Sequence, residues 1–229
     1  MHENIAGKQV LLLFVKAPIR GRVKSRLAAA IGEDAAVELY ENFILDILER
    51  MEESGYPIRI FVYPPDSVEL VSSWLGKERV CVPQTGNDLG ERMEQALKQA
   101  FSEGWERAVL IGSDLPDLPT DVICEAFAAL DANDAVIGPA ADGGYYLIGF
   151  NARLFPAGLF HGILWSTETV FQKTQDLLRA AGLRIHVLPQ WHDVDTVDDL
   201  KTLSERLQGK GCRGSRTSSF LETHRDTLL

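Results

Sequence analysis

Residues 9–16 read QVLLLFVK, and this stretch decides the fold. Its central residues are all apolar, so it lacks the alternation of polar and apolar residues that a half-exposed strand shows. A strand that is apolar on both faces is typical of a parallel sheet that helices cover on both sides. The stretch therefore predicts the central strand of an α/β domain.

After this strand, stretches of helical periodicity alternate with short apolar runs. This alternation predicts a mostly parallel sheet with helices on both faces. Residues 135–138 and 145–150 are two apolar runs with no helix between them, so part of the sheet is expected to be antiparallel. The expected fold is a three-layer α/β/α sandwich around a mostly parallel mixed sheet. Further expected strands are 58–63, 79–82, 108–111 and 184–188, and expected helices are 33–53, 67–75, 88–103, 120–130, 167–181 and 197–207.

The chain of 229 residues is of a size that one hydrophobic core can fill, and 45% of its residues are hydrophobic. We expect a single domain over residues 1–208. Residues 209–219 read GKGCRGSRTSS and show no periodicity, so residues 209–229 are expected to form a Gly/Ser/Arg-rich tail that is mobile rather than packed.

The formal net charge of −10 argues against a partner that is a long nucleic acid, because such binding needs a broad basic surface. The apolar run Val10–Val15 is too short to span a bilayer, and no secretory leader precedes it. The three cysteines are scattered without a C-x-x-C pair. These features predict a cytoplasmic protein with no membrane insertion.

A basic loop follows the first strand and carries five of the 23 basic residues within eleven positions. Such a density of cations, with a glycine that lets a ligand approach the backbone, suits a di- or triphosphate. The alternative is a solvated loop that balances the acidic helix 33–53, and Arg20 and Arg22 fit this alternative best. The candidate nucleotide-binding residues of the loop are Lys16, Pro18, Gly21, Lys24 and Arg26.

Carboxylates follow two later segments of the chain. Asp114 comes directly after the buried strand 108–111, where it could hold Mg²⁺ or Mn²⁺ together with substrate phosphates; a turn-capping role is the alternative. Asp193 and Asp195 could form a second arm of the metal site. For Asp117 a helix-capping role is at least as plausible as a metal role, and Asp198 and Asp199 fit the start of the last helix best.

Residues 142–144, DGG, place a carboxylate and two flexible residues at the start of a strand. Adjacent glycines let a ligand or another backbone come close, which makes Gly143 and Gly144 candidate nucleotide-binding residues. A tight turn explains the same motif equally well. Gln84 lies in a turn before the helix 88–103 and is a further candidate for nucleotide binding.

Six motifs in order resemble the nucleotide-diphospho-sugar transferases of the GT-A type, and more narrowly the bacterial radical-SAM/selenodomain-associated transferases, a family of predicted glycosyltransferases. They are FVKAP (14–18), GRVKSRL (21–27), QTGNDLGERM (84–93), GSDLP (112–116), DGGYYLIG (142–149) and DVDTVDDL (193–200). The resemblance implies a three-layer α/β/α fold that binds a nucleoside di- or triphosphate and a divalent metal.

Carried over to this chain, the resemblance implies that Lys16, Lys24 and Arg26 hold phosphates while Gly21 gives clearance. Asp114 takes the place of the metal-binding acidic motif, and Asp193 or Asp195 that of its partner late in the chain. Gly112 stands where a strict D-x-D motif has its first aspartate, so one carboxylate must do what two often share. Molybdenum-cofactor and 2-phospholactate guanylyltransferases have the same overall pattern, so the fold does not fix the reaction.

The leading hypothesis is a metal-dependent glycosyltransferase with a nucleotide-sugar donor. The acceptor hydroxyl would displace a nucleoside diphosphate, Mg²⁺ or Mn²⁺ would stabilise the leaving phosphates, and Asp142 would act as general base. Two alternatives stay open. One is a nucleotidyltransferase of the guanylyltransferase kind, which releases pyrophosphate from an NTP, and the other is a non-catalytic nucleotide-binding module.

Overall fold

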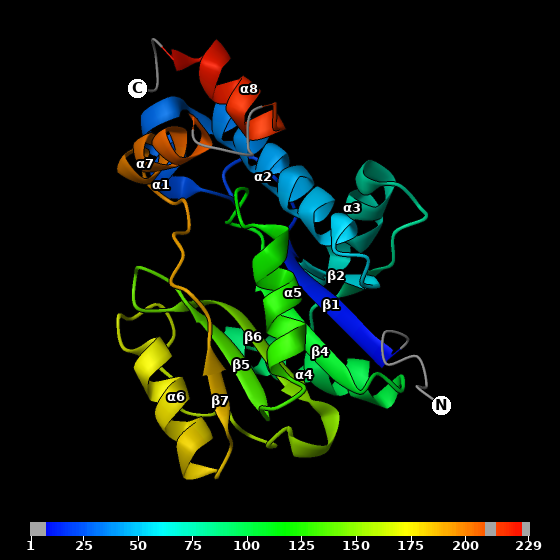
Figure 1. Ribbon diagram of the computed structural model, residues 1–229. Helices are drawn as coiled ribbons and strands as arrows, with labels where there is room; N and C mark the ends of the chain where they lie inside the picture. Colours follow the sequence, from blue (N-terminus) through cyan, green and yellow to red (C-terminus); the bar gives the residue numbers. More distant parts are fainter. Residues whose placement is uncertain (1–7, 209–213, 226–229) are drawn as a thin grey trace.

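The computed structural model describes residues 8–208 and 214–225, and they form a mixed sheet of seven strands in the order β3-β2-β1-β4-β6-β5-β7 (Figure 1). β1 is the third strand of this order and lies in the interior of the sheet between β2 and β4, as its sequence predicts. The strands are β1 (Gln9–Lys16), β2 (Ile58–Tyr63), β3 (Cys81–Pro83), β4 (Arg107–Gly112), β5 (Ala135–Pro139), β6 (Tyr145–Asn151) and β7 (Ile185–Val187). The helices are α1 (Ser25–Ile31), α2 (Glu33–Glu53), α3 (Val68–Leu75), α4 (Leu89–Ser102), α5 (Thr120–Ala129), α6 (Val170–Ala180), α7 (Val197–Gln208) and α8 (Arg216–Thr223).

β6 is the reversed strand of the sheet. It pairs antiparallel with both β4 and β5, whereas β1 pairs parallel with β2 and β4, and β5 pairs parallel with β7. The mixed α/β sheet expected from the sequence is therefore confirmed. The reversal brings the beginning of β6 to the edge where β4 ends, since Ile111 lies opposite Leu147.

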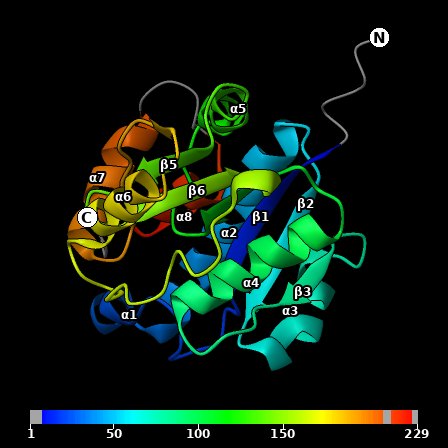
Figure 2. The ribbon, with the colours of Figure 1, turned by 90° about the horizontal axis from the view of Figure 1, so that it is seen from below.

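The two faces of β1 fill two separate cores. Leu11, Leu13 and Val15 pack with apolar residues of α2, α5 and α7, and Val10 and Leu12 pack with residues of α4 and α6. The helices thus cover both faces of the sheet and give three layers (Figure 2). Among the described helices, none has the length and apolarity that crossing a membrane requires.

The C-terminal segment differs from its expectation wherever it is described. Residues 209–213 and 226–229 lie outside the described residues, but Arg216–Thr223 forms the packed helix α8. Phe220 and Leu221 are buried in the same core as α2. The carboxylate of Asp46 accepts hydrogen bonds from the backbone N–H groups of Arg216 (3.0 Å) and Thr217 (2.9 Å), which satisfies the start of the helix.

The expectation of a mobile tail fails here because the Gly/Ser/Arg composition hides a short amphipathic segment. Its two large apolar residues are adjacent and lie at the end of the biased stretch, so no periodicity is visible in a window of usual length. The docking surface is supplied by α2, more than 160 residues earlier in the chain.

Candidate active site

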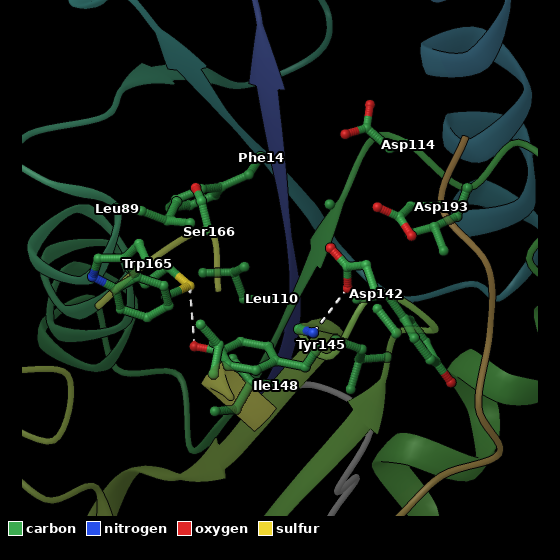
Figure 3. A pocket seen from close by; sticks show the side chains of 18 of the residues that line it. Phe14, Leu89, Leu110, Asp114, Asp142, Tyr145, Ile148, Trp165, Ser166 and Asp193 are labelled. Carbon is green, nitrogen blue, oxygen red and sulfur yellow. Dashed lines mark hydrogen bonds between the residues drawn. The ribbon is translucent and has the colours of Figure 1, made fainter. Parts of the chain in front are cut away.

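A cavity of about 330 Å³ opens at the edge where β1 and β4 end and β6 begins. Ligands bind at this edge in open α/β sheets, beyond the carboxyl ends of the strands. Figure 3 shows carboxylates on one side of the cavity and apolar and aromatic side chains on the other. The predicted site residues that line it are Asp114, Asp142, Gly144, Asp193 and Asp195.

Lys24 lies beneath the acidic side of the site, and only 3% of its side chain is exposed. Its ammonium donates to the backbone oxygen of Val194 (2.7 Å) and to Oδ1 of Asp195 (2.9 Å), and it lies 2.7 Å from Oδ1 of Asp114. An ammonium has three N–H donors, so these contacts use all of them. Lys24 was expected to bind phosphate, but the structure leaves it no donor for that purpose.

Burial and ion pairing act in opposite directions on this lysine and its partners. Burial alone would lower the pKa of Lys24, but Asp114 and Asp195 outweigh it and raise that pKa well above its usual value. Burial alone would likewise raise the pKa of Asp195, and Lys24, with smaller effects from Arg26 and Lys16, lowers it instead. Lys24 and Asp195 therefore stay charged at neutral pH.

Asp193 forms no ion pair with a cation among residues 8–208 and 214–225. Burial, and then the neighbouring charges of Asp142, Asp195 and Asp114, raise its pKa to about 6. Carboxylates from the loop after β4, the turn before β6 and the segment before α7 thus come close enough to repel one another. This end of the cavity carries negative charge that the protein neutralises only in part.

The carboxylates could hold a divalent cation whose coordination shell a bound substrate completes. No three His, Cys, Asp or Glu side chains within residues 8–208 and 214–225 converge tightly enough to enclose a metal by themselves. Magnesium, however, is usually held by one or two carboxylates together with substrate phosphates and water. Asp114 and Asp193 meet this smaller requirement. Oδ1 of Asp114 is engaged with Lys24, as is Oδ1 of Asp195, so Asp114 would offer its other oxygen to the cation.

The basic loop after β1 contains two kinds of cation. Arg20 pairs with Glu33 (3.0 Å) and Asp34 (2.9 Å) at the start of α2, in line with the balancing role considered for it. Lys16, Arg22 and Arg26 are exposed, and within the described part of the chain their side chains form no ion pair. Lys16 and Arg26 still act electrostatically on Asp195, which places their charges near the acidic side of the cavity.

The remaining residues of this loop shape its path. Gly21 is exposed and has a φ of +73°, a conformation that residues with a side chain seldom adopt. Pro18 is half-buried just after β1. Lys24 has a φ of +48° at the start of α1, a backbone conformation that is unusual for a residue with a side chain. From this conformation its side chain extends into the protein and buries its ammonium.

Three further predicted nucleotide-binding residues make contacts within the protein. The side-chain amide of Gln84 is buried and donates to the backbone oxygen of Phe61 (2.9 Å), tying its turn to β2. A Cβ on Gly143 would lie 2.2 Å from the backbone oxygen of Glu168, so its lack of a side chain serves the neighbouring loop. The N–H of Gly144 donates to Oδ1 of Asp142 (2.8 Å) in the turn before β6.

Two acidic residues, for which a role in the fold was considered beside metal binding, form hydrogen bonds that stabilise the fold. Asp117 is buried and accepts hydrogen bonds from Arg206 of α7 (2.6 Å) and from the indole of Trp191 (3.2 Å). Asp199 accepts from the backbone N–H and the hydroxyl of Thr196 (both 2.8 Å) and so stabilises the start of α7, as its position in the first turn of the helix predicts.

Sequence reasoning missed Tyr40 and underrated Trp165. The hydroxyl of Tyr40 accepts from the backbone N–H of Lys16 (3.1 Å) and bonds to Ser113 (2.8 Å), so it ties the end of β1 to the loop of Asp114. A tyrosine hydroxyl on the largely apolar buried face of α2 was its only signal. Trp165 lines the cavity, although it was not among the predicted site residues.

The fold and the site can be compared with known proteins. Residues 47–167 match the family described as "uncharacterized protein conserved in bacteria" (DUF2064). A crystal structure from Desulfovibrio desulfuricans G20, named as a candidate nucleotide-diphospho-sugar transferase, is 40% identical, with 96% of each chain covered and a TM-score of 0.93. Among curated proteins, no match is found.

More distant structures share the fold alone. One is a CMP:2-keto-3-deoxy-manno-octonic acid synthetase complexed with CTP, which is 11% identical over 88% of this chain and 98% of its own, with a TM-score of 0.58. Another is a 4-diphosphocytidyl-2C-methyl-D-erythritol synthase from Anaerococcus prevotii DSM 20548, which is 16% identical over 90% of this chain and 100% of its own, with a TM-score of 0.57.

Proposed function

We propose that this chain, which belongs to the DUF2064 family and is a transferase of the nucleotide-diphospho-sugar type, is a metal-dependent glycosyltransferase with a nucleotide-sugar donor. The observation that carries the proposal is the cavity that borders carboxylates of three separate segments, with the cations of the basic loop close by. The narrower resemblance to the radical-SAM/selenodomain-associated transferases also favours glycosyl transfer.

The diphosphate of the donor would bind to Lys16 and Arg26. Both are exposed and free of ion pairs within the described residues, and both act on Asp195 at the acidic side of the cavity. Charged hydrogen bonds to phosphate are stronger than neutral ones, and a glycine such as Gly21 lets the donor approach the backbone. Lys24 would act indirectly, by holding Asp114 and Asp195 in place.

Asp114 and Asp193 would hold Mg²⁺ or Mn²⁺ together with the phosphates of the donor. The metal would supply charge stabilisation for the leaving diphosphate. The protein's own carboxylates give this end its negative charge, which adds to burial in raising the pKa of Asp193 to about 6.

Asp142 would act as general base in an inverting transfer. One of its oxygens accepts from the N–H of Gly144, and the other has no hydrogen-bond partner among the described residues. The acceptor hydroxyl would give its proton to Asp142 while its oxygen bonds to the anomeric carbon of the sugar. The bond from that carbon to the diphosphate breaks, and the nucleoside diphosphate leaves with the electron pair.

The test is to incubate the protein with a panel of nucleotide sugars and nucleoside triphosphates, with and without Mn²⁺, and to identify the phosphate products by ³¹P NMR. Metal-dependent release of a nucleoside diphosphate from one nucleotide sugar is the expected result. Asp114→Asn should abolish the metal-dependent part, and Asp176→Asn, an exposed aspartate of α6, should leave it unchanged.

A second candidate is nucleotidyl transfer. Lys16, Arg22 and Arg26 provide three exposed cations without ion pairs in the described structure, enough to suit a triphosphate. Pyrophosphate release from an NTP would establish this candidate and contradict the first. Thermal stabilisation by a nucleotide without any product would instead indicate a binding module; at 100 times the dissociation constant it should amount to about 2.7 kcal/mol.

A further inference from the structure

The cavity has an apolar half on the side of α4 and α6. Phe14, Leu110 and Ile148 point into it from three neighbouring strands, and Leu89 and Trp165 close it on the outer side (Figure 3). Phe14, Leu110 and Ile148 are all buried, so this half is a recess in the core rather than an open surface.

The polar groups near this recess are already engaged or face elsewhere. The hydroxyl of Tyr145 donates to the sulfur of Met93 (3.8 Å), and the hydroxyl of Thr167 donates to the backbone oxygen of Leu164 (2.9 Å). The indole N–H of Trp165 is buried and has no hydrogen-bond partner in the described part of the chain, and its nitrogen lies on the side of the ring away from the carboxylates (Figure 3). Ser166 is then the available hydroxyl among the described residues of this half.

A sugar or a nucleobase would lose hydrogen bonds in such a recess. Each polar group that leaves water without a new partner costs binding free energy, whereas apolar groups gain from leaving it. The recess also has the capacity for a substantial group, because a cavity of about 150 Å³ lined by apolar residues holds benzene, and the whole cavity here is about 330 Å³.

We propose that the recess binds an uncharged, apolar portion of the acceptor, and that this acceptor presents a hydroxyl to Asp142. The inference rests on the proposed function, and it names the chemical class of the second substrate: an alcohol with an alkyl or aromatic body. The donor then occupies the side of Lys16 and Arg26, and the two substrates meet at the carboxylates.

The recess is held in shape before any ligand arrives. Gly90 of α4 packs directly under Trp165, since a Cβ there would lie 2.6 Å from the indole ring. The loop that carries Trp165 is tied to α4 by Glu94, which is buried and accepts from the N–H of Gly158 (2.9 Å). A preformed site loses little conformational freedom on binding, which favours affinity for small apolar ligands.

The test measures binding of the alkanols from 1-propanol to 1-hexanol by ligand-observed NMR, with glycerol and glucose as hydroxyl-rich comparisons. Each added methylene should tighten binding about fourfold, the factor that burial of one CH₂ group provides. Leu89→Gln should weaken the binding of 1-hexanol at least fourfold. Leu70→Gln is the matched control, because Leu70 is an exposed leucine of α3 outside the cavity lining, and it should change nothing.

The inference is overturned if glycerol or glucose binds as tightly as 1-hexanol, or if Leu89→Gln leaves the alkanol series unchanged. Nucleotide binding and donor turnover are measured on the same protein, and they distinguish a failure of the apolar acceptor site from a failure of the glycosyltransferase proposal. If the protein turns over a donor but shows no preference among the alkanols, the apolar acceptor is rejected and the glycosyltransferase proposal stands. A normal alkanol series without any donor turnover rejects both the glycosyltransferase and the acceptor role of the recess.

Discussion

Lys24 connects three parts of the chain through one ammonium group. Its acceptors belong to the loop after β4 and to the segment before α7, and its own backbone starts α1. Its charge also lies over the faces of Tyr40 and Phe43, at 5.7 and 5.6 Å from the ring centroids. A cation so placed stabilises the geometry of the acidic side of the site.

Lys24→Met should lower the free energy of unfolding by about 3 kcal/mol, because two partly buried carboxylates lose their partner. Urea unfolding followed by circular dichroism measures the change. Lys16→Met is the matched control: Lys16 is exposed and unpaired in the described structure, so its loss should shift stability by no more than about 0.5 kcal/mol. Equal effects of the two substitutions would contradict the central role of Lys24.

Gly90→Ala should destabilise the protein by roughly 1–3 kcal/mol, because the added methyl meets the ring of Trp165 at 2.6 Å and Cβ of Phe160 at 2.9 Å. Chemical denaturation measures the loss. Gly112→Ala provides the comparison, since a Cβ at Gly112 has no atom within 4 Å and its backbone is not in the left-handed region. A stable Gly90→Ala protein would show that Trp165 moves aside without cost.

At the scale of elements, β6 and α8 decide which segments meet. β6 reverses direction and so brings the turn of Asp142 to the edge that holds Asp114. α8 packs against α2 and is fixed there by Asp46 and by the ion pair of Arg216 with Glu49 (2.7 Å). β6 thus helps to build the site, and α8 completes the core on the face of the sheet that α2 covers.

Phe220→Ala should lower the free energy of unfolding by about 3 kcal/mol, because the side chain is 4% exposed and its removal leaves a cavity between α8 and α2. Thermal or urea unfolding shows this directly. Glu222→Ala, on the exposed side of the same helix, should have little effect. A neutral Phe220→Ala would mean that α8 does not contribute to the core.

Asp134 should make the junction of β5 and β7 sensitive to acid. Its carboxylate accepts from the guanidinium of Arg184 and from the backbone N–H of that residue (2.8 Å), and these contacts lower its pKa below the ordinary 3.8. The unfolded chain therefore takes up a proton more readily, so the stabilisation is full above about pH 4 and is lost as the pH falls through the lowered pKa.

The measurement compares melting temperatures of the wild type and Asp134→Asn between pH 7 and pH 3. The variant should melt lower at pH 7, and the gap should close toward pH 3. Asp121 is an exposed aspartate of α5 that forms no ion pair with any described residue, so Asp121→Asn should run parallel to the wild type over the whole range. A gap that stays constant with pH would contradict the assignment.

For the whole molecule, local patterns predict the framework and leave the contacts between distant segments open. The apolar run of β1 and the cap of α4 by Asp88, which accepts from the N–H of Glu91 (2.8 Å), depend on neighbours in sequence and are readable from it. The burial of Lys24 depends on Val194 and Asp195, about 170 residues later. Composition gives its charge but not its partners.

The described residues should unfold as one cooperative unit. The two cores share the sheet, with alternate residues of β1 in each, and α8 belongs to one of them. Thermal unfolding followed by far-ultraviolet circular dichroism and by tryptophan fluorescence should therefore give coincident transitions. An earlier transition in either signal would reveal a separately melting part.

The internal ammonium of Lys24 also influences how an anion approaches the site. It offsets one of the negative charges of Asp114 and Asp195 from below, while Lys16 and Arg26 are exposed on the loop after β1. The electrostatic field over the cavity is therefore asymmetric. It attracts phosphate on the side of that loop and repels it on the side of Asp142 and Asp193. A phosphorylated ligand would therefore be steered in from the loop side and would arrive already oriented.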